Sequence, residues 1–62
     1  MTLPTAEAVA RAFCRRRGID PNDDGNDEGW PNWWFYLAAA EVQLARRREQ
    51  AEWDAAIEEA RS

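Results

Sequence analysis

The chain has 62 residues, of which 45% are hydrophobic and four are tryptophan, and its formal net charge is −4 because twelve acidic residues outnumber eight arginines. A domain of about 60 residues buries only ~60% of the surface that its unfolded chain exposes, so we expect one marginally stable domain over residues 1–62. The negative charge argues against direct nucleic-acid binding, and the lack of a long apolar run or a signal-peptide pattern argues against a membrane, so we expect a cytoplasmic protein.

The first predicted element is a helix over about residues 5–17. Thr5 is a suitable N-cap, and apolar residues follow on one face at spacings of three and four: Ala6, Val9, Ala10 and Phe13. Gly18 can take the left-handed conformation that ends a helix, with Ile19 folding back in a Schellman motif. The arginines before Gly18 then lie where the helix dipole is negative.

The segment 18–29 is predicted to be an acidic loop. It holds five carboxylates together with Pro21, Gly25 and two Asn, and from Asp20 to Gly29 it has no apolar side chain. Its first half, from Asp20 to Gly25, matches the opening of an EF-hand calcium loop, but the position that requires a bidentate Glu is Pro31. An ordinary solvated turn explains the same residues without a metal, so we expect no cofactor.

A second, long helix is predicted over about residues 31–60, with Pro31 at its first position or Asn32 as its cap. No Gly or Pro interrupts the segment after Pro31, which would be about 40 Å long at 1.5 Å per residue. Its first half has two apolar stripes: Trp30 or Trp33 with Leu37, Ala40 and Leu44, and Phe35 with Ala38, Val42 and Ala45. One stripe can pack on the first helix, and the other needs a different cover.

The far end of this long helix would extend beyond the shorter first helix. Its apolar stripe contains Trp53 and Ile57. We therefore predict an all-α helical hairpin, made of a short helix, an acidic loop and a long helix, that forms a homodimer through Trp53 and Ile57. A frayed amphipathic tail is the alternative for this end.

Catalysis is not expected from this composition. The chain has no His and no Lys, its Ser is the terminal Ser62, and Cys14 has no imidazole to activate it. Cys14 is instead expected to be a small buried hydrophobe, with an intermolecular disulfide or a reactive thiolate as the alternatives.

Two stretches carry a resemblance to a known class of proteins. The run from Arg11 to Pro21, Arg-Ala-Phe-Cys-Arg-Arg-Arg-Gly-Ile-Asp-Pro, is followed after the acidic loop by Trp-Pro-Asn-Trp at residues 30–33 and an Ala-rich helix. This arrangement, over about residues 8–45, resembles small accessory proteins of phages and prophages, and among these the short acidic anti-CRISPR proteins. The resemblance implies a stoichiometric inhibitor of a type I CRISPR-Cas surveillance complex in the host bacterial cytoplasm, and it assigns no site residues.

The residues themselves predict a protein-binding surface. Carboxylates spaced like phosphates can act as a decoy for a basic groove, and neighbouring indole rings supply the apolar anchors that dominate interface energies. We expect electrostatic capture by Asp23, Asp24, Asp27 and Glu28, and anchoring by Trp30 and Trp34. A calcium-binding protein and a structural or scaffolding phage protein are the alternative functions.

Overall fold

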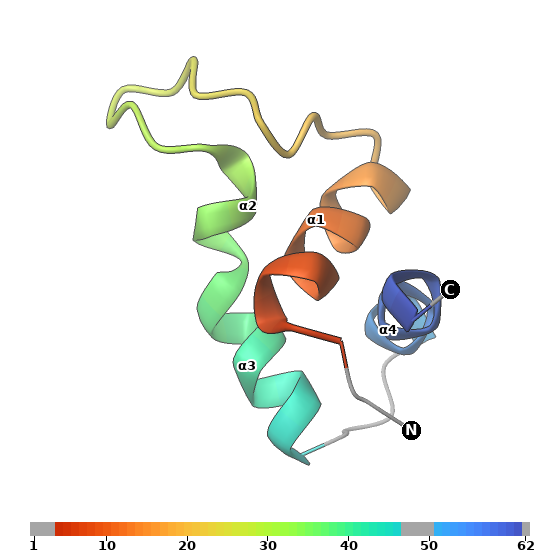
Figure 1. Ribbon diagram of the computed structural model, residues 1–62. Helices are drawn as coiled ribbons and strands as arrows, with labels where there is room; N and C mark the ends of the chain where they lie inside the picture. The colour runs from red at the N-terminus through yellow and green to blue at the C-terminus, as the bar shows by residue number, and fades with distance from the viewer. Residues whose placement is uncertain (1–3, 47–50, 62) are drawn as a thin grey trace.

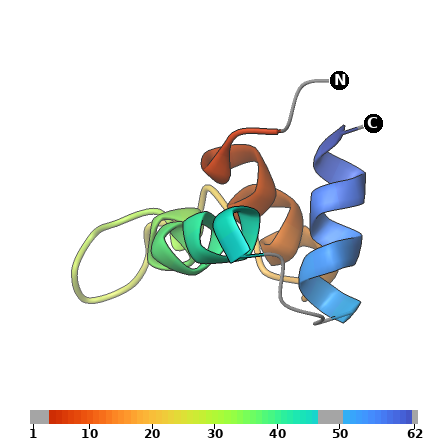
Figure 2. The same cartoon turned by 90° about the horizontal axis from the view of Figure 1, so that it is seen from below.

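The computed structural model describes residues 4–46 and 51–61 of the chain, and the regular secondary structure of these residues is helical. The helices are α1 (Ala6–Arg16), α2 (Asn32–Phe35), α3 (Leu37–Arg46) and α4 (Ala51–Arg61). Within those residues there is no strand, so the all-α prediction is confirmed. In both views α1 lies between the α2–α3 segment and α4 (Figures 1 and 2).

Helix α1 begins as its sequence predicts. The Oγ1 atom of Thr5 accepts a hydrogen bond of 3.1 Å from the amide of Ala8. This bond satisfies one of the amides that the first turn of a helix leaves without a partner.

The end of α1 is a Schellman motif centred on Gly18, whose φ is 74°. The amide of Gly18 donates to the carbonyl of Arg15 at 3.1 Å, and the amide of Ile19 donates to the carbonyl of Cys14 at 2.9 Å. A side chain at position 18 would be strained at this φ, so glycine here both stops the helix and directs the chain into the loop.

The structure corrects the prediction of one long helix over residues 31–60. The described residues of this segment form three helices, and α2 ends at Phe35, followed by its C-cap Tyr36, where φ is −99° and ψ is −1°. Residues 47–50 lie outside the described part of the chain. Helix α4 packs against α1 and crosses the direction of α3, as the end-on view of α4 in Figure 1 shows. A single straight helix would have left the apolar face of α4 in water.

The core forms where these helices meet α1. The rings of Phe13 and Trp53 stack with their centroids 3.9 Å apart and their planes 9° from parallel. Tyr36 approaches the same phenylalanine at 5.3 Å. Fully buried alanines and Val9 complete this core cluster, and Ile57 joins it with 3% of its surface exposed; the alanines are Ala10, Ala12, Ala40 and Ala56. Burying a large apolar side chain stabilises a fold by about 1.5–3 kcal/mol. The packing of α4 against α1 therefore contributes a large part of the free energy of unfolding of so small a domain.

Ion pairs join α1 to α4 at the edge of this core. Arg17 pairs with Glu52 at 3.1 Å, and Arg15 pairs with Glu59 at 3.5 Å. Exposed pairs of this kind contribute about 0–1 kcal/mol each, so they align the two helices more than they stabilise them.

We expect Trp53→Ala to lower the free energy of unfolding by about 3–5 kcal/mol, because the substitution leaves a cavity against Phe13. Urea unfolding followed by far-UV circular dichroism measures this loss. Trp34→Ala is the matched control, with an expected loss of no more than about 1.5 kcal/mol, because that indole is 43% exposed and its ring contacts lie at the surface. An unchanged urea midpoint for Trp53→Ala, accompanied by a lower mass in ultracentrifugation, would contradict a core role for Trp53.

Candidate functional site

The acidic loop is held in shape by its own short polar side chains. Three of them accept a hydrogen bond from an amide two residues further along the chain. These bonds join Asp20 to the amide of Asn22 at 3.0 Å, Asp23 to that of Gly25 at 2.8 Å, and Asn26 to that of Glu28 at 3.0 Å. Such Asx turns order a loop locally without a core.

The loop is also fixed to the start of α2. The amide of Asn32 donates to the carbonyl of Asp23 at 3.0 Å, and the amide of Trp33 donates to the carbonyl of Pro21 at 3.1 Å. The side-chain amide of Asn32 donates to the carbonyl of Asp20 at 3.0 Å. Loop carbonyls thus satisfy the first amides of α2, whose N-cap Pro31 has no side-chain hydrogen bond to offer.

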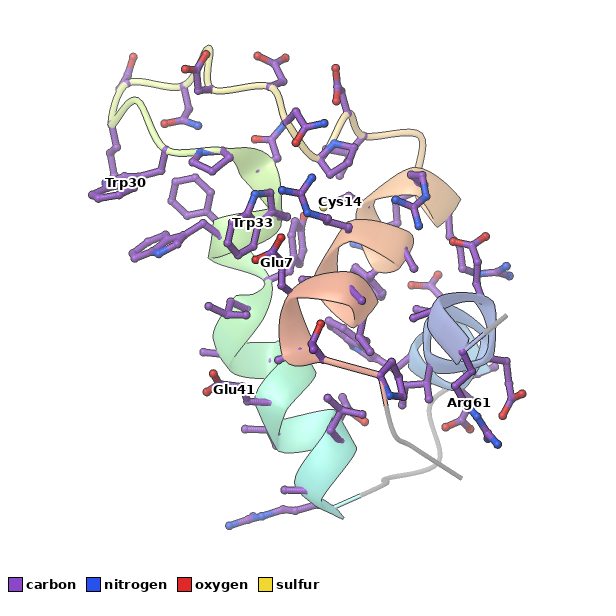
Figure 3. All side chains as sticks on the ribbon, in the orientation of Figure 1. Glu7, Cys14, Trp30, Trp33, Glu41 and Arg61 are labelled. Carbon is purple, nitrogen blue, oxygen red and sulfur yellow. The ribbon has the colours of Figure 1, made fainter. Side chains whose placement is uncertain are left out.

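Arg11 connects α1 to both of these elements. Its guanidinium donates to the side-chain oxygen of Asn22 at 2.6 Å and pairs with Glu7 at 3.0 Å. The same guanidinium lies 5.1 Å from the centroid of the Trp33 ring, a cation–π contact. Trp33 therefore faces α1, as Figure 3 shows, and its ring packs against the core.

Three other rings point away from α1 and form a surface that we call the aromatic patch: Trp30, Trp34 and Phe35. Their exposed fractions are 47%, 43% and 44%. The two indoles stack with centroids 4.9 Å apart, and Phe35 meets Trp34 edge-on at 5.6 Å. The rings are thus ordered by contact with one another, although nothing in the described part of the chain covers them.

A cleft extends the aromatic patch along α3. It has a volume of about 270 Å³, and its lining residues are Trp34, Phe35, Leu37, Ala38 and Glu41. Figure 3 shows Trp30 and Glu41 on the same side of the α2–α3 segment, opposite α1. Val42, with 46% of its surface exposed, continues the apolar stripe beyond the cleft. The predicted packing of one stripe on the first helix is confirmed for Trp33, Ala40 and Leu44, whereas Leu37, predicted for the same stripe, lines the outer cleft instead.

The predicted capture residues differ in their surroundings. Asp24, Asp27 and Glu28 are exposed, and their carboxylates have no hydrogen-bond or ion-pair partner among the described residues, whereas the carboxylate of Asp23 is engaged in its Asx turn. The predicted anchors Trp30 and Trp34 lie together in the aromatic patch.

Trp53 and Ile57, predicted for self-association, require a correction. They are only 7% and 3% exposed, because α4 folds back and buries them against α1. They therefore offer little surface to a second copy, and the part of Trp53 that stays accessible lines a cleft beside α1. The dimer itself stays a prediction, without the interface that the sequence suggested for it.

Two features of the surface were missed by sequence reasoning. Glu41 is the single charged residue between Glu28 and Arg46, and this isolation in an apolar stripe was a signal that it borders a site. A second cleft, of about 490 Å³, lies between α1, α3 and α4, and is lined by Phe13, Arg17, Tyr36, Ala39, Ala51, Glu52 and Trp53. It depends on the return of α4, which the sequence pattern did not reveal.

The loop carboxylates do not converge. In the described ranges, no three side chains of the His, Cys, Asp or Glu type lie close enough together to hold a metal ion. The half EF-hand sequence from Asp20 to Gly25 is used instead for two Asx turns. The calcium alternative gains no support from this geometry.

Cys14 is fully buried. Burial raises the pKa of its thiol above the ordinary value of 9.0, and the positive charges of Arg15 and Arg11 oppose this shift in part. The expected role as a small buried hydrophobe is confirmed, and the neutral thiol is a weak nucleophile.

The comparisons with known proteins give one partial similarity. Over 43 residues the chain is 42% identical to the acyl-CoA dehydrogenase family member 11 of Rattus norvegicus, a match that covers 69% of this chain and 5% of the rat protein. The chain thus spans about one twentieth of that protein's length. No protein-family model matches the chain, and no solved structure matches it. None of the helices within residues 4–46 and 51–61 is long and apolar enough to cross a membrane.

We expect Cys14 to react with iodoacetamide far more slowly in the native protein than in urea, as mass spectrometry can follow. Because the folded pKa is raised, the stability contributed by the neutral thiol is present below pH 9.0 and is lost as the pH rises from there through the folded value. The free energy of unfolding should therefore fall between pH 8 and pH 11 by more in the wild type than in Cys14→Ala. Equal pH dependences, or equal alkylation rates, would contradict this account.

Proposed function

We propose that this chain is a non-enzymatic protein-binding module whose aromatic patch docks on a larger protein. The observation that carries the proposal is the pair of stacked indoles, Trp30 and Trp34, which are 47% and 43% exposed. Tryptophan is the residue type most enriched at the energetic centre of protein interfaces. Exposed apolar patches rimmed by polar residues mark interaction sites on soluble proteins.

The order of the patch supports the same proposal. The stacked indoles and the edge-on Phe35 restrain one another, and the loop that precedes them is fixed by hydrogen bonds to α2. Rings that are already positioned lose little conformational entropy when a partner covers them. The carboxylates of Asp24, Asp27 and Glu28, which have no partner in the described part of the chain, lie a few residues before the patch in the loop and would accelerate the encounter with a basic surface.

The partial similarity to the rat protein identifies no partner. The matched 43 residues are about one twentieth of that protein, so a segment of this kind there belongs to a much larger chain. An uncovered apolar stripe is expected of a segment that packs on such a body. The match is too short to transfer an activity, and we propose none.

The narrower prediction of an anti-CRISPR inhibitor acting in the host bacterial cytoplasm stays a prediction. It rests on the resemblance over about residues 8–45 and on the acidic loop. In this form of the proposal, the loop carboxylates imitate DNA phosphates in front of a type I surveillance complex, and the aromatic patch holds the inhibitor in place.

The docking proposal is tested by replacing both exposed indoles. We expect Trp30→Ala with Trp34→Ala to reduce the specific capture of a partner from a bacterial lysate by at least about 30-fold, since hot-spot residues contribute 2 kcal/mol or more. Quantitative mass spectrometry of the captured proteins provides the measurement. Arg16→Ala is the matched control, because it removes an exposed long side chain at the far end of α1.

Circular dichroism must show that both variants keep the native helix content. A partner that is retained equally by the double variant and by Arg16→Ala would overturn the proposed function. A partner lost from both variants would likewise exclude the patch as the specific binding surface.

The inhibitor form makes a separate prediction about infection. In bacteria with an active type I CRISPR-Cas system that targets a phage, the wild-type chain should restore plaque formation. A variant with Asp23, Asp24, Asp27 and Glu28 changed to Asn or Gln should restore less, because it lacks the charges that steer binding. Plaque counts that are unaffected by the wild-type chain would refute the inhibitor form and leave the docking proposal to its own test.

A further inference from the structure

The charge of this protein is divided between two halves of the fold. Residues 18–45 carry no Arg or Lys, and all eight arginines of the chain lie outside this range. The acidic residues within it number six: Asp20, Asp23, Asp24, Asp27, Glu28 and Glu41. This range forms the loop, α2 and nearly all of α3, the elements that carry the aromatic patch and its cleft.

Carboxylates in the two halves also differ in their partners. On α1 and α4, four of them pair with an arginine: Glu7, Glu52, Glu58 and Glu59. In the acidic half, the carboxylates of Asp24, Asp27, Glu28 and Glu41 have neither an ion pair nor a hydrogen bond within the described residues. The face around the patch is thus both apolar and negatively charged, with its charge left unneutralised by the parts of the chain that are described.

We propose that the cleft beside the aromatic patch binds an amphipathic helix of the partner, with an aliphatic side chain in the cleft and Arg or Lys residues beside it. The inference rests on the proposed docking function and specifies the partner's chemistry. The cleft is open at Ala38 because that side chain is small. Trp34 and Phe35 form the apolar wall of the cleft, and Glu41 is the one ionisable residue that lines it.

A helical partner fits the form of this face. Phe35, Ala38 and Val42 are spaced by three and four residues along α2 and α3, so they lie on one side of the segment, with the larger Phe35 and Val42 on either side of the small Ala38. Helices pack by setting the side-chain ridges of one into the grooves of the other. A cleft of about 270 Å³ on this side has room for one large aliphatic side chain of a helix laid alongside.

Arginine is the cation that this surface favours most. Exposed indole faces attract a guanidinium by cation–π interaction, and a carboxylate beside them adds a charge-assisted hydrogen bond. The chain already contains this arrangement on its other side, where Arg11 lies 5.1 Å from the Trp33 centroid and pairs with Glu7. Glu41 and the indole of Trp34, which line the same cleft, offer the same combination to a partner.

A second copy of the chain is a poor occupant on charge grounds. A symmetric dimer brings the same patch of each subunit together. Here that contact would oppose two segments that each carry six acidic residues and no basic residue, and like charges across an interface are unfavourable.

The test uses the full chain and two labelled synthetic peptides of about 18 residues, or five helical turns. Both peptides carry the same Leu stripe, but one has Arg and the other Glu at the flanking positions. We expect fluorescence anisotropy to show the Arg peptide binding at least about tenfold more tightly at about 50 mM salt, and a smaller difference at about 300 mM salt. Glu41→Gln should weaken the Arg peptide about threefold, as expected for one exposed charge pair.

Asp54→Asn is the matched control, because it removes one exposed carboxylate from α4, outside the patch and its cleft, and should leave the affinity unchanged. Equal affinities of the two peptides, or equal effects of Glu41→Gln and Asp54→Asn, would overturn the inference. The inference would also be overturned if the wild-type chain sediments as a dimer and the Trp34→Ala variant sediments as a monomer, because a second copy of the chain would then occupy the cleft.

These failures are distinct from a failure of the proposed function. If the natural partner is lost from the Trp30 and Trp34 double variant while the peptides show no charge preference, docking stands and the basic helix is excluded. If the natural partner is retained by that variant, the docking function and this inference fall together.

Discussion

The structure depends on one contact between residues that lie forty positions apart, the stacking of Phe13 on Trp53 at 3.9 Å. It places α4 on one side of α1 while α2 and α3 occupy another, so the short first helix becomes the centre of the molecule. Val9, Ala12 and Cys14 are fully buried as a result. A two-helix hairpin would have covered only one face of α1, and a chain of this length has few other ways to enclose a core.

This arrangement decides which apolar surface is left over. The core takes one stripe of the α2–α3 segment, through Trp33, Tyr36, Ala40 and Leu44, and the apolar face of α4. The opposite stripe, which begins at Trp30 and continues to Val42, has nothing among the described residues to pack on. The same helices that complete the core therefore present an ordered aromatic surface, and the segment that carries it, residues 18–45, holds six acidic residues and no basic one.

Several local features follow from the sequence alone because their causes lie within a few residues. The cap at Thr5, the Schellman motif at Gly18 and the loop from Asp20 to Gly29 each depend on the chemistry of a short segment. Periodicity also showed that the segment after Pro31 has more than one apolar stripe, so the existence of an uncovered face could be predicted. The cleft beside Glu41 could not be predicted in the same way. It depends on which apolar stripe packs on α1, and the sequence does not specify this.

The sequence by itself determined that the protein is all-α, where its first helix begins and ends, and that Trp30 and Trp34 belong to an excess of ring surface. Only the tertiary structure decided whether Trp53 and Ile57 are exposed or buried. Their helical spacing would suit an exposed interface equally well, but both side chains are buried against α1. Helical periodicity identifies an apolar face but carries no information about what covers it. That choice is made by packing between distant segments, where burying Trp53 on Phe13 outweighs the local preference for a continuous helix.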